Sequence, residues 1–140
     1  MPNEAAVGVA GRRARYYRWL FVFAAMWNAL SACAVLFLLT SQKFRQDTGF
    51  PGSADTISLQ LLASSLLVFG LGYYWVSRDL SRNRDLVKLG VTGKPLVILV
   101  FFAHALLHEI PWLVTVPSVV DALFGALFLE FLLRTRGETQ

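Results

Sequence analysis

Residues 17–40 read YRWLFVFAAMWNALSACAVLFLLT, and after Arg18 this stretch contains no charged residue. A helix needs about 20 predominantly apolar residues to cross the hydrocarbon core of a bilayer. The stretch is too long for a signal peptide, and no small-residue cleavage site leading into a soluble domain follows it. It therefore predicts a retained transmembrane helix.

Three further apolar segments follow, at residues 57–76, 95–110 and 117–133. The chain is 56% hydrophobic and 16% charged, which is too apolar for a soluble domain of 140 residues. Pro95 and Pro117 are each expected at the first position of a helix, where the missing N–H would have no partner anyway. Residues 111–117 then form a short turn between the last two segments. The sequence predicts one all-α domain over residues 1–140: an antiparallel four-helix transmembrane bundle with an amphipathic cytoplasmic segment between helices 2 and 3.

The basic residues predict the orientation of these helices. Of the 13, three precede the first segment and Arg18 lies at its start, five lie between the second and third, and two follow the fourth, which leaves Lys43 and Arg45 for the other side. The positive-inside rule then places both termini in the cytoplasm, in a multi-pass protein of the cell membrane. Because the topology accounts for the positive charge, the lipid bilayer is the expected partner and nucleic acid is not. The single cysteine, Cys33, excludes an intrachain disulfide.

The segment from Ser77 to Lys94 carries alternating charges and apolar residues. At helical spacing Asp85 can pair with Arg82 and with Lys88. Gly90 and Gly93 are expected to end this amphipathic helix before Pro95. One interpretation is an anchor on anionic headgroups, and the other is a surface for a soluble partner or an acidic ligand. The residues expected at the membrane surface are Arg78, Arg82, Arg84, Lys88 and Lys94.

Polar residues inside apolar segments are costly and therefore mark functional sites. With the topology above, several of them fall in the outward half of the bilayer. Asp121 is expected to face a histidine of the third segment across the hairpin, because a carboxylate facing lipid costs about 2.5–3.5 kcal/mol. The predicted polar cluster, open to the outer side, contains Asn28, Gln60, Ser64, His104, His108, Glu109 and Asp121.

His104 and His108 are four residues apart, which on a helix places them one turn apart, and Glu109 follows. Such a pair suits zinc, and a carboxylate–histidine pair suits acid–base chemistry or a proton relay. A third interpretation is a hydrogen-bonded cluster that only holds the helices together. Two histidines are too few for a membrane di-iron oxygenase, and one helical turn cannot supply both axial ligands of a haem. Glu109 follows the second histidine, so the zinc-protease signature is absent.

A family resemblance rests on the middle and last thirds of the chain. The runs Gly70-Leu71-Gly72-Tyr73, Arg78-Asp79, Arg82-Asn83-Arg84, Leu89-Gly90 and Gly93-Lys94 resemble small four-helix bacterial membrane proteins of the DoxX-like kind. The resemblance implies the same four-helix bundle. The quinone-linked activity of some members is not carried over, since no residue here matches a site for it.

Three classes of function remain open at this stage. The first is a membrane protein that binds a hydrophobic or lipid-like ligand, or a partner membrane subunit, through the polar cluster. The second is a membrane-embedded enzyme, for example an isomerase or oxidoreductase, using acid–base or metal-assisted chemistry on a lipophilic substrate. The third is a small transporter that needs to form a homo-oligomer to enclose a path. The sequence does not identify a cofactor.

Overall fold

The computed structural model describes residues 4–41, 56–110 and 112–136. It contains four α-helices, α1 (Glu4–Thr40), α3 (Thr56–Arg78), α4 (Arg84–Leu106) and α5 (Val116–Arg134), with a 3₁₀ helix, η1 (Trp112–Thr115), before α5. No strand occurs in these described ranges. All four α-helices are long and apolar enough to cross a membrane. The predicted all-α fold with four transmembrane helices is confirmed.

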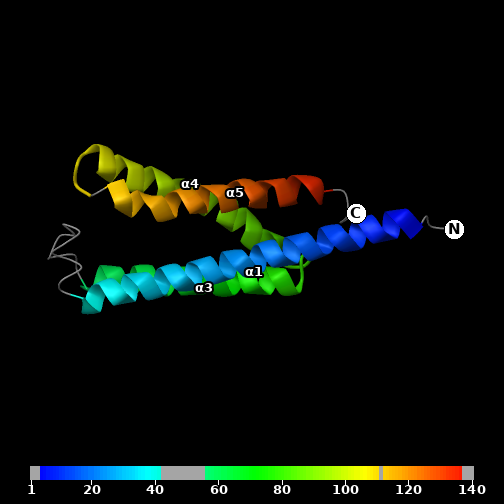
Figure 1. Ribbon diagram of the computed structural model, residues 1–140, viewed down its shortest axis with the longest axis horizontal. Helices are drawn as coiled ribbons and strands as arrows, with labels where there is room; N and C mark the ends of the chain where they lie inside the picture. The colour runs from blue at the N-terminus through cyan, green and yellow to red at the C-terminus, as the bar shows by residue number, and fades with distance from the viewer. Residues whose placement is uncertain (1–3, 42–55, 111, 137–140) are drawn as a thin grey trace.

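The helices pack as two pairs, α1 with α3 and α4 with α5 (Figure 1). The pairs meet in a core of nine buried residues near the end of the bundle where α3 ends and α4 begins. Aromatic rings dominate this core, and those of Phe21, Phe128 and Phe131 are completely or almost completely buried. The buried core consists of Tyr17, Leu20, Phe21, Ala24, Tyr73, Val76, Val87, Phe128 and Phe131.

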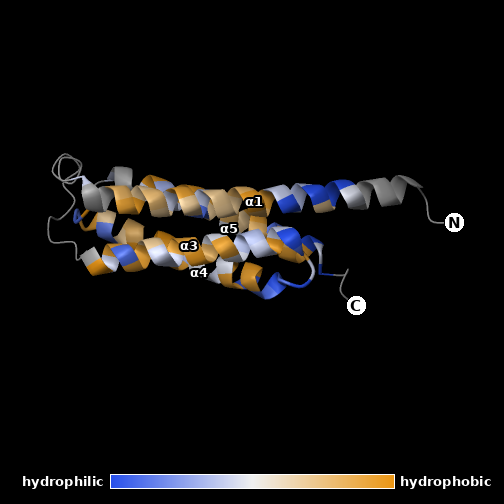
Figure 2. Ribbon diagram, turned by 90° about the horizontal axis from the view of Figure 1, so that it is seen from below, coloured by the Kyte–Doolittle hydropathy of each residue, from blue (hydrophilic) through white to orange (hydrophobic). Residues whose placement is uncertain are grey.

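Most large apolar side chains outside this core are exposed, among them Leu30, Val68, Leu99 and Leu123. A water-soluble protein rarely exposes so much contiguous apolar surface, whereas lipid solvates it without penalty. Hydrophilic residues gather at the end of the molecule that carries both termini and the α3–α4 connection (Figure 2). α1 extends past the other helices at this end (Figure 1). Its 37 residues span about 55 Å, against about 30 Å for a bilayer core.

Helices α1 and α3 approach closely at Gly70. A Cβ added there would lie 3.2 Å from the backbone oxygen of Ala25 and 3.3 Å from the Cβ of Asn28. Asn28 is buried and donates from Nδ2 to the Ala24 carbonyl oxygen at 2.9 Å. The side-chain amide of Asn28 thus finds a hydrogen-bond partner within its own helix. The apolar interface between α1 and α3 would otherwise leave this buried amide unpaired.

Helix α4 begins eleven residues earlier than the sequence predicted. It runs without interruption from Arg84, and Pro95 lies inside it. The predicted break at Gly90 and Gly93 and the predicted start at Pro95 are therefore wrong. Residues 84–94 of this segment form the first three turns of α4, and Gly90 packs there against Tyr73 and Phe128. Pro117 lies in the first turn of α5, one residue after the predicted first position.

Candidate functional site

Lys94 and Asp121 form an ion pair between α4 and α5. Lys94 stands near the middle of α4, and Asp121 lies in the second turn of α5. Their side chains are only 7% and 16% exposed. A buried pair of opposite charges in a membrane-spanning helix pair is the most unusual chemical feature of the described chain.

Three aromatic rings surround the ammonium group of Lys94. Its Nζ lies 5.6 Å from the ring centroid of Tyr73, 5.7 Å from that of Phe124 and 5.9 Å from that of Phe128. A ring face attracts a cation, and the attraction is stronger where water is excluded. Since Asp121 neutralises the charge and the rings solvate the rest of the ammonium group, the cost of burying the lysine is offset. The ion pair and the rings connect α3, α4 and α5.

This arrangement corrects two predictions. Lys94 was expected at the membrane surface, but it is 6% exposed inside the helix bundle. Asp121 was expected to pair with His104 or His108, but its ion-pair partner is Lys94. The α4–α5 connection runs from Leu107 to Thr115 and includes η1, so a tight turn does not join the two helices. Lys94, and not a histidine at the end of α4, therefore lies opposite Asp121.

The two histidines do not share a helical face, because α4 ends at Leu106. His108 has a φ of 60°, which is the left-handed conformation. The Glu109 N–H donates to the His104 carbonyl at 3.0 Å, and the His108 N–H donates to the Ala105 carbonyl at 3.1 Å. This is the Schellman pattern that ends many helices, with histidine where glycine is usual. The structure thus removes the one-turn spacing on which the predicted histidine metal site depended.

His104 pairs through Nδ1 with Glu109 across this helix end, and both side chains are about half exposed. Within the described ranges, no group of three or more His, Cys, Asp or Glu side chains is arranged to hold a metal ion. Binding of metal by His104 and His108 stays a prediction.

The remaining members of the predicted polar cluster lie elsewhere. Asn28 is buried between α1 and α3, while Gln60 and Ser64 are exposed on α3. The seven residues therefore do not gather into one outward-facing pocket. The polar side chains that do gather are those of Lys94 and Asp121, beside the ring of Tyr73.

A groove of about 260 Å³ runs between α4 and α5 beside the ion pair. Lys94 and Gly125 line its middle, where a Cβ on Gly125 would lie 3.7 Å from the Lys94 Cβ. The small residues of α5 leave this space open, because larger side chains would fill it. We call this space the α4–α5 groove. Its other lining residues are Val91, Pro95, Ile98, Ala122, Ala126 and Leu129.

No protein-family model, curated protein or solved structure matches this chain. The resemblance to DoxX-like proteins therefore stays a prediction.

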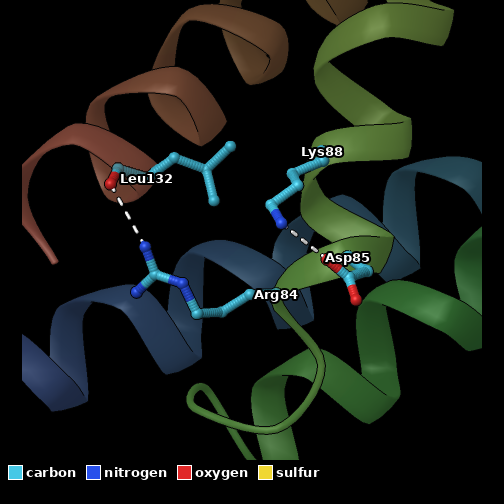
Figure 3. A network of polar contacts seen from close by, with 4 residues as sticks. All are labelled: Arg84, Asp85, Lys88 and Leu132. Carbon is cyan, nitrogen blue, oxygen red and sulfur yellow. Dashed lines mark hydrogen bonds and ion pairs between the residues drawn. The ribbon is translucent and has the colours of Figure 1, made fainter. Parts of the chain in front are cut away.

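The start of α4 is attached to the end of α5 by Arg84 (Figure 3). Its guanidinium group donates to the carbonyl oxygen of Thr135 at 2.9 Å and to that of Leu132 at 3.2 Å, and it lies 5.6 Å from the ring centroid of Phe131. The last carbonyls of a helix have no partner within the helix and carry partial negative charge. Arg84 supplies both the donors and the positive charge at that end.

The charges around the α3–α4 connection follow the sequence prediction in part. Lys88 pairs with Asp85 at 2.7 Å, as predicted, and both side chains are exposed. The predicted Arg82–Asp85 pair is not formed in the described structure; the backbone N–H of Arg82 instead donates to Oδ1 of Asp79 at 3.0 Å. This bond, together with those from Ser81, lowers the pKa of the Asp79 carboxyl below its usual value.

Proposed function

We propose that this is a multi-pass protein of the cell membrane with both termini and the α3–α4 connection in the cytoplasm. Four candidate spans support an even number of crossings, which puts the termini on one side. With Lys94 inside the bundle, ten of the 13 basic residues remain on the side of the termini. Such an excess of Lys and Arg in short flanking segments is characteristic of the cytoplasmic side.

Cysteine labelling tests this orientation. In a Cys33→Ala background, a cysteine at residue 5 or 138 is expected to react with a membrane-impermeant maleimide only after the cells are opened. A cysteine at residue 47 is expected to react in intact cells. Labelling of either terminal cysteine in intact cells would contradict the proposed orientation.

We propose further that the protein binds a hydrophobic, lipid-like ligand in the α4–α5 groove. This proposal rests on an apolar groove that is open at the surface of the membrane-spanning helices α4 and α5. The groove lies next to Lys94 and Asp121, whose opposite charges neutralise each other. At about 260 Å³ it is smaller than the ~300–1,000 Å³ pockets that hold drug-sized ligands. One acyl chain is the kind of ligand segment that suits it.

Crosslinking by a lipid with a photoactivatable acyl chain tests this proposal in vesicles that contain the full chain. Labelled peptides are expected from α4 and α5 at the groove. Ala126→Phe places a ring in the groove and is expected to reduce this labelling about tenfold, which corresponds to ~1.4 kcal/mol.

Leu123→Phe is the matched control, because Leu123 is exposed on the same helix and does not line the groove. Equal labelling of the wild type and Ala126→Phe would show that the groove is not the binding site. Crosslinks to a second protein instead of lipid would favour the partner-subunit alternative. The enzyme and transporter alternatives stay predictions.

A further inference from the structure

A basic residue stands at one end of the α4–α5 groove. Lys88 precedes the groove residues Val91, Pro95 and Ile98 by three, seven and ten positions, so it shares their face of α4. Figure 3 shows its side chain on the side of α4 that faces Leu132 of α5. The Lys88 side chain is 64% exposed, so its ammonium group is accessible one helical turn before Val91, the first groove residue of α4.

The other end of the groove carries no such charge. Between Lys94 and His104, α4 contains only apolar residues, and on α5 the residues before Asp121 are uncharged as well. At the end of the groove near Lys88, the basic residues outnumber the acidic ones. The basic residues are Arg84, Lys88, Arg134 and Arg136, and the acidic residues are Asp85 and Glu130. The groove is thus polarised, with positive charge at the end that the proposed orientation places in the cytoplasm.

The existing partners of these charges leave Lys88 available to an anion. Arg84 is engaged with the end of α5, and Arg134 pairs with Glu130 at 3.1 Å. Within the part of the chain that the structure describes, the Lys88 ammonium group pairs only with Asp85, whose side chain is 91% exposed. An exposed pair at this spacing contributes only a few tenths of a kcal/mol in general. A phosphate that brings its own negative charge can therefore share or replace that contact.

From these observations we propose that the groove binds an anionic phospholipid of the cytoplasmic leaflet. One acyl chain occupies the groove beside Pro95 and Gly125, and the phosphate group contacts the ammonium group of Lys88. This inference rests on the proposed function, because it names the lipid class and the leaflet for the same groove. Lys94 takes no part in headgroup binding, since Asp121 and the three rings already surround it.

The test compares two photoactivatable lipids with identical acyl chains, one with a phosphatidylglycerol headgroup and one with phosphatidylcholine, in vesicles that contain the full chain. Groove labelling by phosphatidylglycerol is expected to exceed that by phosphatidylcholine about fivefold, equal to ~1 kcal/mol for one basic residue at an anionic surface. Lys88→Gln is expected to remove this preference without changing phosphatidylcholine labelling. Asp85→Asn is expected to increase the preference, because it removes the competing carboxylate.

Arg82→Gln is the matched control, because Arg82 is an exposed basic residue of the α3–α4 connection that precedes α4. It is expected to leave the preference unchanged. Equal labelling by the two lipids would overturn the inference and leave the proposed function standing, whereas absence of groove labelling by both would overturn both. Loss of the preference on addition of millimolar inorganic phosphate would assign the Lys88 site to free phosphate and also overturn the inference.

Discussion

Replacing Lys94 by methionine is expected to destabilise the protein by about 3–5 kcal/mol, the usual cost of removing one partner from a buried ion pair. Methionine keeps an unbranched apolar stem against Gly125, so the loss reports on the charge more than on packing. Asp121→Leu is expected to cost a similar amount, because it leaves the ammonium group with only the rings of Tyr73, Phe124 and Phe128.

The double variant Lys94→Met/Asp121→Leu is expected to regain most of the lost stability, since it removes both charges together. Thermal unfolding of the four proteins in one detergent measures the cycle. Lys88→Met is the matched control, because the exposed Lys88–Asp85 pair contributes only a few tenths of a kcal/mol. Strictly additive losses in the double variant would show that the two charges do not stabilise each other.

Gly90→Ala is expected to destabilise the protein by about 1–3 kcal/mol, the range for an overpacked core. This is the opposite of the usual effect, because alanine in place of glycine inside a helix stabilises by about 0.5–1 kcal/mol. A Cβ at Gly90 would lie 2.7 Å from the Tyr73 hydroxyl oxygen and 3.1 Å from Cδ2 of Phe128. Both rings belong to the buried core and flank the Lys94 ammonium group, so they have little freedom to move.

Gly93→Ala is the control on the same helix, because a Cβ at Gly93 would meet nothing within 4 Å. It is expected to raise the midpoint of thermal unfolding, while Gly90→Ala lowers it. Tyr73→Phe removes the oxygen nearest to the new Cβ and is expected to restore part of the stability lost in Gly90→Ala. A stabilising Gly90→Ala would show that Tyr73 does not pack against α4 in this way.

The approximate positions of the membrane helices could be predicted, because the length and the apolarity of a segment can be read from its own residues. The start of α4 could not, because glycine and proline near Lys94 resemble a helix boundary in sequence. Whether such residues end a helix is decided by packing, here the contact of Gly90 with Tyr73 and Phe128. A helix that begins at Pro95 places Lys94 at the membrane surface and leaves Asp121 without this partner, whereas the longer α4 places Lys94 inside the bundle.

The error at the histidines has a different cause. Counting four residues from His104 to His108 assumes that the helix continues, but it ends at Leu106. The proline rule gives no warning here, because Pro111 disfavours helical conformation only at Ile110 and would leave His108 in the helix. The left-handed backbone of His108 has no sequence signal either, because glycine is the residue that normally marks that position.

The pairing of Lys94 with Asp121 also determines how the protein responds to a membrane potential. A single charge that crosses the whole membrane gains or loses about 2.3 kcal/mol per 100 mV, so a lone charge near mid-depth would feel roughly half of that. The two opposite charges are in contact, so the electrical work on one nearly cancels the work on the other. The stability of the bundle therefore depends little on voltage through this ion pair. Removing only one of the two charges would make the stability of the bundle depend on the potential across the membrane.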